Sequence, residues 1–309
     1  TPSPPRNNAS LVTKGFELSV GWNDRISADL SYNLRLTLGD NKTKILEYNN
    51  QKGLIDTWYK GKNYGEIWGF VTDGLIQTPG ESMPDQSKLG TAWGPGDMKY
   101  KDLTNDGAVT EGSRTIDDHG DLTIIGNTSP RFNFGFTGGI NWKAFDFNMF
   151  WQGLAKQDYY PHANSSLFYG LTAAFSSSSI LKDSPSLDYW RPADETNILG
   201  PNTDAYFAKP YFNAQQTNKN RWVQSRYVLN GAYMRLKNVT IGYTLPHKFA
   251  NKVFMQKARV FVSGENLLTF TSLPKTLDPE TVFANNTGNS VQATYPISKF
   301  LTLGFNLTF

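Results

Sequence analysis

Every second residue is apolar in the stretch ISADLSYNLRLTL, which occupies residues 26–38. A β-strand turns successive side chains to opposite faces, so this stretch predicts a strand with one apolar face and one polar face. The preceding run GFELSVGW, residues 15–22, alternates in the same way, and only residues 23–25 separate the two runs. The sequence therefore predicts a tight β-hairpin whose turn lies at residues 23–25.

Strand signals continue along the chain, and no long helical period accompanies them. Further strand-like stretches lie at residues 65–77, 132–142, 145–151, 239–245, 258–270 and 300–309. A short helical turn is expected within residues 246–256. Counting strand directions back from the last stretch requires an even number of strands in residues 39–128, which places an additional strand at 41–48 or 97–101. We therefore expect an all-β chain of about eight to nine strands.

Composition leaves two environments open for the apolar faces. The chain has 309 residues, a net charge of +3 and a mean hydropathy of −0.47, values that also suit a soluble protein. No run approaches the roughly 18 apolar residues of a membrane-spanning helix. The absence of cysteine excludes disulfides and thiolate metal sites, and the small charge gives no reason to expect nucleic acid as a partner. A soluble β-sandwich, which also alternates, remains an alternative.

Three features favour a transmembrane β-barrel over a soluble sandwich. Aromatic residues lie near the ends of the expected strands on the apolar side: Trp22, Tyr32, Trp142, Trp151, Tyr243 and Phe309. Such residues form girdles where hydrocarbon meets lipid headgroups. The opposite faces carry small polar residues, and short connections alternate with long ones, as in outer-membrane barrels. Because lipid offers no hydrogen bonds to the backbone, a membrane sheet must close on itself by pairing its last strand with its first. A chain that ends on a strand suits this closure.

Several blocks of sequence resemble a known family. In chain order they are KGFELSVGW at 14–22, GFVTDGLIQT at 69–78, GDMKYKDLTNDGAV at 96–109, IGNTSPRFNFGFTGGINWKAFDFNMFWQG at 125–153, YMRLKNVTIGYTLP at 233–246 and ARVFVSGENLLTFT at 258–271. In these blocks the chain is similar to the C-terminal portion of SusC/RagA-type TonB-dependent outer-membrane transporters of the Bacteroidetes.

The resemblance implies both a fold and a function. Residues 1–309 would form the C-terminal part of a transmembrane antiparallel β-barrel, supplying about 8–10 of about 22 strands. The plug domain and the earlier strands would lie outside this sequence, and residues 152–228 would form a long extracellular loop. The implied function is TonB-dependent import of oligosaccharides or peptides across the outer membrane, as the barrel component of a SusCD-like transporter, with no enzymatic activity.

The resemblance also implies partners and a location. The partners are a SusD-like surface lipoprotein, TonB–ExbB–ExbD through the missing N-terminal region, outer-membrane lipid, the barrel assembly machinery and a second SusC-type barrel. The protein would be a multi-pass β-barrel protein of the cell outer membrane. The apolar alternation of the last strand predicts a membrane insertion signal at Leu303, Phe305, Leu307 and Phe309.

One local motif suggests a cation. The run Asp102-Leu-Thr104-Asn-Asp106-Gly107 alternates oxygen ligands before a glycine, as the start of a calcium loop does. The acid expected at the twelfth position is replaced by Ser113, so a later acid would have to complete the site. The predicted ligands of a structural calcium ion are Asp102, Thr104, Asp106, Asp117 and Asp118. No other cofactor is required, and the alternative is a solvated turn.

The long connection at 152–228 combines aromatic and polar residues. Such side chains stack on sugars or anchor protein interfaces, although a loop of this length also packs on itself. The predicted substrate or partner contacts are Tyr159, Tyr160, Trp190, Arg191 and Trp222.

Two rival functions are weighed against transport. The first is a soluble all-β carbohydrate-binding module. The second is a β-rich hydrolase that uses the acidic cluster at residues 117–121, and it is disfavoured because no nucleophile motif lies nearby.

Overall fold

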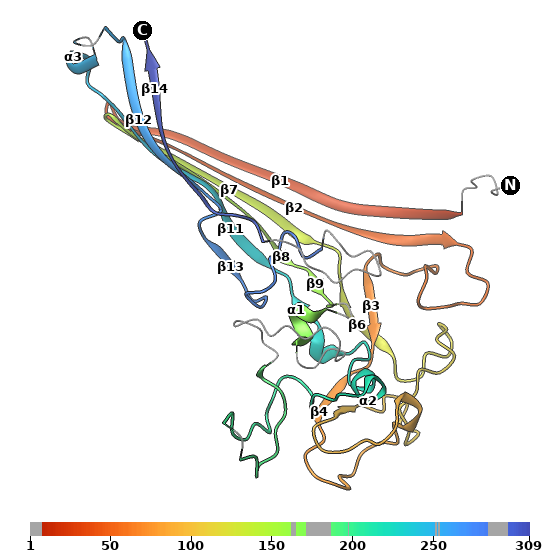
Figure 1. Ribbon diagram of the computed structural model, residues 1–309. Coiled ribbons are helices and arrows are strands. Elements are labelled where there is room, and N and C mark those ends of the chain that lie inside the picture. The colour runs from red at the N-terminus through yellow and green to blue at the C-terminus, as the bar shows by residue number, and fades with distance from the viewer. Residues whose placement is uncertain are drawn as a thin grey trace, which may run out of the picture.

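The computed structural model describes residues 8–161, 165–170, 187–196, 198–250, 252, 254–283 and 296–309. Its main feature is a large open antiparallel sheet with a body of loops at one end (Figure 1). The sheet contains β1 (Ala9–Ser27), β2 (Leu30–Tyr48), β7 (Arg131–Trp142), β8 (Phe145–Lys156), β11 (Tyr233–Thr244), β12 (Lys257–Glu265) and β14 (Phe300–Thr308), paired in that order, and the short β13 (Thr269–Thr271), which pairs with β11.

The remaining elements lie mostly in the long connections. They are β3 (Glu66–Gly69), β4 (Thr72–Leu75), β5 (Met98–Tyr100), β6 (Thr123–Asn127), β9 (Asp158–Tyr159), β10 (Leu229–Asn230), α1 (Ser166–Tyr169), α2 (Ala214–Lys219), and two 3₁₀ turns at Ser87–Leu89 and Ser225–Tyr227. The short α3 (His247–Ala250) lies between β11 and β12, where a helical turn was predicted. Within the described part of the chain, no helix has the length and apolar character needed to cross a membrane.

The connections are sorted by length to the two ends of the sheet. The β1–β2, β7–β8 and β11–β12 connections are short and lie at one end (Figure 1). The connections at 49–130 and 157–232 are long and leave the other end, where parts of both form one body, here called the loop domain. The predicted alternation of short and long connections is confirmed, and so is the all-β class.

The predicted position of the first hairpin turn was wrong. β1 continues through residues 23–25, which pair with residues of β2, and the turn lies at Ala28 and Asp29. The guanidinium of Arg25 donates to the carbonyl oxygens of Ser27 and Ala28 at 3.1 and 2.8 Å, which holds the end of the hairpin. Polar residues at 23–25 suggested a turn, but long-range strand pairing prevails over this local preference.

The additional strand expected in residues 39–128 does not join the sheet. Residues 41–48 continue β2, and β2 pairs directly with β7. The stretch at 65–77 forms β3 and β4, which pair with β6 and β5 outside the main sheet. Its apolar residues, including Phe70 and Leu75, are buried in the loop domain. The main sheet nevertheless has eight strands, because β12 and β13 divide the stretch predicted at 258–270.

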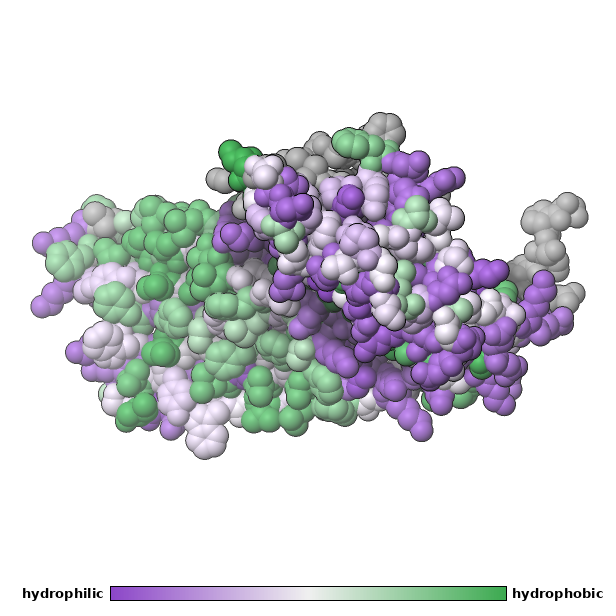
Figure 2. Space-filling model, turned by 90° about the horizontal axis from the view of Figure 1, so that it is seen from below, coloured by the Kyte–Doolittle hydropathy of each residue, from purple (hydrophilic) through white to green (hydrophobic). Residues whose placement is uncertain are grey.

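One face of the sheet is apolar and largely uncovered. In β14 the side chains of Leu303 and Phe305 are 64% and 62% exposed, and they lie beside Val262 and Val260 of β12. Leu307 is exposed as well, while Leu30 and Phe134 are half-buried among their neighbours in the sheet. Figure 2 shows apolar side chains gathered over the part of the sheet near the short turns, and hydrophilic ones over the long connections. No second layer of described chain covers this apolar face.

The opposite face of the sheet is polar, and its side chains pack closely against glycines of neighbouring strands. Asp146 of β8 and Arg259 of β12 form an ion pair with an N–O distance of 2.5 Å. They meet across β11 above Gly242, where an added Cβ would lie within about 2.5 Å of both side chains. A glycine is therefore required for this cross-strand pair. The structure sets the facing of the stretch at 258–270, which the sequence left open: Arg259 and Phe261 lie on this polar face.

The loop domain holds the main hydrophobic core of the described chain. Its largest fully buried rings include Tyr100, Phe168, Tyr169, Phe207 and Tyr227. The rings of Phe207 and Tyr227 are stacked with centroids 5.6 Å apart. Since these residues come from both long connections, the core joins segments far apart in the sequence.

Replacement of Phe207 by alanine is expected to loosen the loop domain. Phe207 is fully buried, and removal of such a ring costs roughly 3–5 kcal/mol. Phe212→Ala is the matched control, because Phe212 is 92% exposed and should change stability by less than about 0.5 kcal/mol. Pulse proteolysis in increasing urea measures both variants. Equal resistance of the two variants would contradict the core position of Phe207.

Candidate functional site

Backbone hydrogen bonds join the two long connections. The amide of Phe70 donates to the carbonyl of Val223 at 2.8 Å, and the amide of Ser225 donates back to the carbonyl of Phe70 at 2.9 Å. The hydroxyl of Thr72 donates to Oε1 of Gln224 at 2.9 Å. The edge of the first loop is thus paired with a segment more than a hundred residues later.

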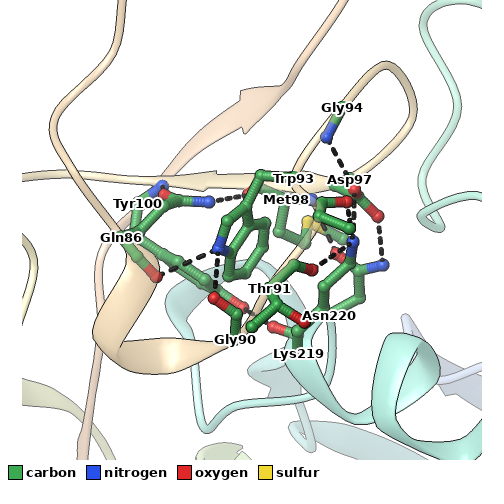
Figure 3. A network of polar contacts seen from close by, with 11 residues as sticks. Gln86, Gly90, Thr91, Trp93, Gly94, Asp97, Met98, Tyr100, Lys219 and Asn220 are labelled. Carbon is green, nitrogen blue, oxygen red and sulfur yellow. Dashed lines mark hydrogen bonds and ion pairs between the residues drawn. The ribbon is translucent and has the colours of Figure 1, made fainter.

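A buried ion pair lies at the centre of this junction (Figure 3). Nζ of Lys219 is 2.7 Å from Oδ2 of Asp97, and the two side chains are only 1% and 0% exposed. Asn220 donates to the other carboxylate oxygen of Asp97 at 2.8 Å, and the backbone amide of Gly94 donates to Oδ2 at 2.9 Å. Because both oxygens are hydrogen-bonded, the carboxylate can remain charged in the interior.

The ammonium group of Lys219 is enclosed on its other sides as well. It donates to the carbonyl of Ala92 at 2.7 Å and lies 5.1 Å from the ring centroid of Trp93 and 5.0 Å from that of Tyr211. These contacts replace the water that a lysine normally keeps. Lys219 therefore fixes the end of α2 against the first loop.

Gln86 and Tyr100 extend the network. The side chain of Gln86 donates to the carbonyl of Met98 at 2.8 Å and accepts from the amide of Tyr100 at 3.2 Å (Figure 3). The hydroxyl of Tyr100 donates to the carbonyl of Lys219 at 3.0 Å. Burial raises the pKa of Tyr100, so this hydroxyl stays protonated as a donor. The network therefore joins residues 86–100 of the first long connection to Lys219 of the second.

A pocket of about 480 Å³ opens beside this network. It is lined by Pro95, Tyr189, Trp190, Arg191, Pro192, Glu195, Lys209 and Pro210. Two of the predicted contact residues, Trp190 and Arg191, therefore lie in its wall. Apolar walls with a few charged groups are typical of sites for small ligands or for side chains of a partner.

Trp190 and Arg191 also have structural roles. Trp190 is 5% exposed, and its indole nitrogen donates to Gln77 at 3.2 Å. The guanidinium of Arg191 donates to the carbonyls of Gly200 and Leu187 at 2.5 and 3.2 Å, which folds the segment around it. Only a small part of either side chain can reach a ligand. Their role in substrate or partner contact stays a prediction.

The other predicted contact residues are not gathered at this pocket. Tyr159 is buried in a second small cluster with Leu273 and Val282. The hydroxyl of Tyr160 donates to the carbonyl of Trp222 at 3.1 Å, and Trp222 donates from its indole nitrogen to the carbonyl of Leu89 at 2.8 Å. The neighbours Leu273, Val282 and Leu89 belong to other connections of the chain. A role of these three residues in substrate or partner contact stays a prediction.

The acidic motif forms hydrogen-bonded turns. Asp102 accepts from the amides of Asn105 and Gly107 at 2.6 and 2.8 Å. Burial acts to raise the pKa of Asp102, but the hydrogen bonds from these amides prevail and keep it below its ordinary value. Thr104 donates from its hydroxyl to Asp102 at 3.1 Å, and Asp106 accepts from the amide of Ala108 at 2.9 Å.

The later acids serve separate turns. Asp118 accepts from the hydroxyl and amide of Ser113, which lowers its pKa. Asp117 is exposed. The buried Asp121 accepts from Leu103, Thr104 and Thr110 and so joins the two ends of the segment. Within the described part of the chain no three acidic or histidine side chains are placed to share an ion, and calcium binding stays a prediction.

Sequence reasoning missed the residues that organise the loop domain. Asp97, Lys219 and Asn220 were not singled out, although they carry the central ion pair. Asp97 lies in a block that was noted only for its family resemblance. No spacing in one sequence relates a residue near 97 to one near 219, so only pairs that vary together among relatives would have carried this signal.

Comparison with known proteins places the fold among TonB-dependent receptors. No protein-family model matches the chain. The chain is 27% identical over 325 residues to TonB-dependent receptor P3, and 26% identical over 328 residues to TonB-dependent receptor P26, both of Formosa agariphila. Each alignment covers 98% of this chain but only 29% and 30% of the receptor. The chain therefore spans less than a third of the length of these relatives.

Solved structures give the same fold. A chain of the RagAB peptide transporter superposes with a TM-score of 0.66 and 19% identity, covering 98% of this chain and 30% of that one. The "open-open" state of the RagAB peptide importer gives a TM-score of 0.63 and 21% identity over 97% of this chain and 29% of that one. The fold and the relatives thus define an antiparallel sheet of the kind found in TonB-dependent receptors. The resemblance to SusC/RagA-type TonB-dependent transporters is confirmed.

Breaking the buried ion pair is expected to separate the two loops. Lys219→Met leaves Asp97 buried without its cation, which typically costs roughly 3–5 kcal/mol. Lys99→Met is the control, because Lys99 pairs with Glu81 at 2.8 Å but is partly exposed, and it should cost about 1 kcal/mol or less. Hydrogen exchange at the amides of residues 97–100 reports the opening. Unchanged protection in Lys219→Met would contradict the central role of the pair.

Proposed function

We propose that this chain forms part of the barrel wall of a TonB-dependent importer in the outer membrane, as the barrel component of a SusCD-like transporter for peptides or oligosaccharides. The observation that carries the proposal is the uncovered apolar face of a sheet whose inner strands are hydrogen-bonded on both sides. Monomeric soluble proteins seldom expose so continuous an apolar surface. In a bilayer, the same face meets hydrocarbon, and the strands satisfy one another's backbone groups.

The dimensions of the sheet support a membrane location. Transmembrane strands need about 9–11 residues, and β7 and β8 have 12 residues each. At the end with the short turns, Trp142 stacks on Phe145 at 6.2 Å, and Phe145 lies 4.7 Å from Tyr243. This row of rings has the position of an interfacial girdle. The short turns would then face the periplasm, and the loop domain, including the connection predicted at 152–228, the cell exterior.

The remaining parts of the proposal concern partners. β1 and β14 are the two edges of the described sheet, and strands from elsewhere in the full-length protein would pair with them to close the barrel. A SusD-like lipoprotein would bind the loop domain near the pocket of Trp190. Coupling to TonB–ExbB–ExbD would occur through the N-terminal region, with the plug domain inside the barrel, and a second barrel of the same type would complete a dimer.

The rival functions have less support. The uncovered apolar face disfavours a soluble carbohydrate-binding module, which would hide this face in its core. The hydrolase hypothesis needs acids that act together, but Asp118 is hydrogen-bonded to Ser113 and Asp121 is buried under three donors. Of the acidic cluster this leaves the exposed Asp117. The relatives carry the names of receptors and of a transporter, which accords with a non-enzymatic role.

Charge on the apolar face should impair insertion. Leu303→Asp places a carboxylate on the proposed lipid face, where charge costs up to roughly 2–4 kcal/mol. Thr302→Asp is the matched control, because the neighbouring side chain points to the polar face. Removal of Phe309, which is 76% exposed, should act in the same direction as Leu303→Asp by weakening recognition by the assembly machinery. The amount of folded full-length protein in outer-membrane fractions is the measurement, and equal assembly of Leu303→Asp and Thr302→Asp would count against a lipid-facing Leu303.

Uptake should depend on TonB and on the pocket. In cells whose full-length transporter carries Lys209→Glu, uptake of labelled peptides or oligosaccharides is expected to fall several-fold, because Lys209 is the exposed cation of the pocket. Lys60→Glu, an exposed lysine outside the pocket, is the control.

Deletion of TonB should abolish uptake in every strain. Uptake that persists without TonB would refute the proposed mechanism, and equal uptake by the two variants would remove the pocket from the pathway.

A further inference from the structure

Two short turns of the sheet each place a lysine over an aromatic ring. In the β7–β8 turn, Nζ of Lys143 lies 5.8 Å from the ring centroid of Trp142. In the β11–β12 connection, Nζ of Lys252 lies 5.9 Å from the ring centroid of Phe249. Both lysines are exposed, and both aromatic rings are more than half exposed. The same arrangement thus occurs twice at one end of the sheet (Figure 1).

The two turns belong to neighbouring strands and are connected. The amide of Thr244 donates to the carbonyl of Ala144 at 2.8 Å, which ties the end of β11 to the β7–β8 turn. The row of rings through Trp142, Phe145 and Tyr243 runs between them on the apolar face. The lysines therefore lie just beyond the aromatic row, where the apolar face ends.

The acids near these lysines do not form ion pairs with them. Among the described residues, neither ammonium lies within ion-pair distance of a carboxylate. Asp146, the acid nearest in the β7–β8 hairpin, is already paired with Arg259 on the polar face. The exposed Asp29 belongs to the adjacent β1–β2 turn, and its backbone carbonyl accepts from the amide of Lys143 at 2.8 Å. Residues 245–258 contain no Asp or Glu but also include His247, Lys248 and Lys257.

We propose that these two turns bind the headgroups of anionic phospholipids in the leaflet next to the short turns. Aromatic girdles lie at headgroup level, and a lysine beside them keeps its stem on apolar surface while its ammonium reaches the phosphate. The occupant is a lipid because both sites continue the apolar face. This inference rests on the proposed placement of the sheet in a bilayer.

The test compares lipid retention by the full-length transporter and its Lys143→Gln/Lys252→Gln variant. Native mass spectrometry counts molecules of dioleoylphosphatidylglycerol bound to protein released from micelles, with dioleoylphosphatidylcholine as the neutral comparison. Each lysine near a lipid surface contributes roughly fivefold in affinity for anionic lipid. The double variant should therefore lose its preference for phosphatidylglycerol by on the order of twentyfold.

The control is Lys60→Gln/Lys101→Gln, which removes the same charge from exposed lysines of the long connections. This control should retain phosphatidylglycerol like the wild type. Equal loss in both double variants, or unchanged retention in Lys143→Gln/Lys252→Gln, would overturn the inference. Displacement of the lipid by inorganic phosphate at equal concentration would also overturn it by assigning the site to free phosphate. If the full-length wild type is absent from outer-membrane fractions, the proposed membrane function fails instead.

Discussion

Cross-strand backbone pairing is the constraint on which the rest of this structure depends. From β1 to β14 each strand gives its amide and carbonyl groups to its neighbours, with an unbroken path of antiparallel pairs. Between its two edge strands, the sheet can therefore leave apolar side chains such as Ile241 and Val262 uncovered without exposing unpaired backbone groups to an apolar environment. The same pairing sends every long connection to one end and every short one to the other. The pairing of the strands thus accounts both for the apolar face of the sheet and for the position of the loop domain at one end.

The loop domain solves a different physical problem from the sheet. Its two long connections bury an aromatic core around Phe207 and Tyr227, and this burial offsets the entropy lost when the connections are ordered. The ion pair between Asp97 and Lys219 then fixes which parts of the two connections meet, because a buried charge is stable only opposite its partner. The pocket at Trp190 is one product of this folding, and it is held by the same segments.

Much of the sheet was predictable, and most of the loop domain was not. Alternation at residues 26–38 and 300–309 identified strands because side chains in a strand change face at every residue. The turn placed at 23–25 was wrong because local polarity cannot show how far two strands remain paired. Aromatic composition pointed to Tyr159 and Trp222 as contacts, which stays a prediction, and composition could not show that Tyr159 is buried beside Leu273. Asp97 and Lys219 carried no signal in one sequence.

The sequence alone determined the strand periodicity, the two unlike faces and the aromatic residues near the strand ends, since these depend only on which residue types occupy alternate positions. The tertiary structure decided where the first hairpin turns, that residues 65–77 leave the sheet, and that Asp97 meets Lys219. The physical reason is the range of the interactions. Alternation is a property of adjacent residues, whereas strand pairing and buried charge pairing join segments whose separation along the chain leaves no trace in local sequence.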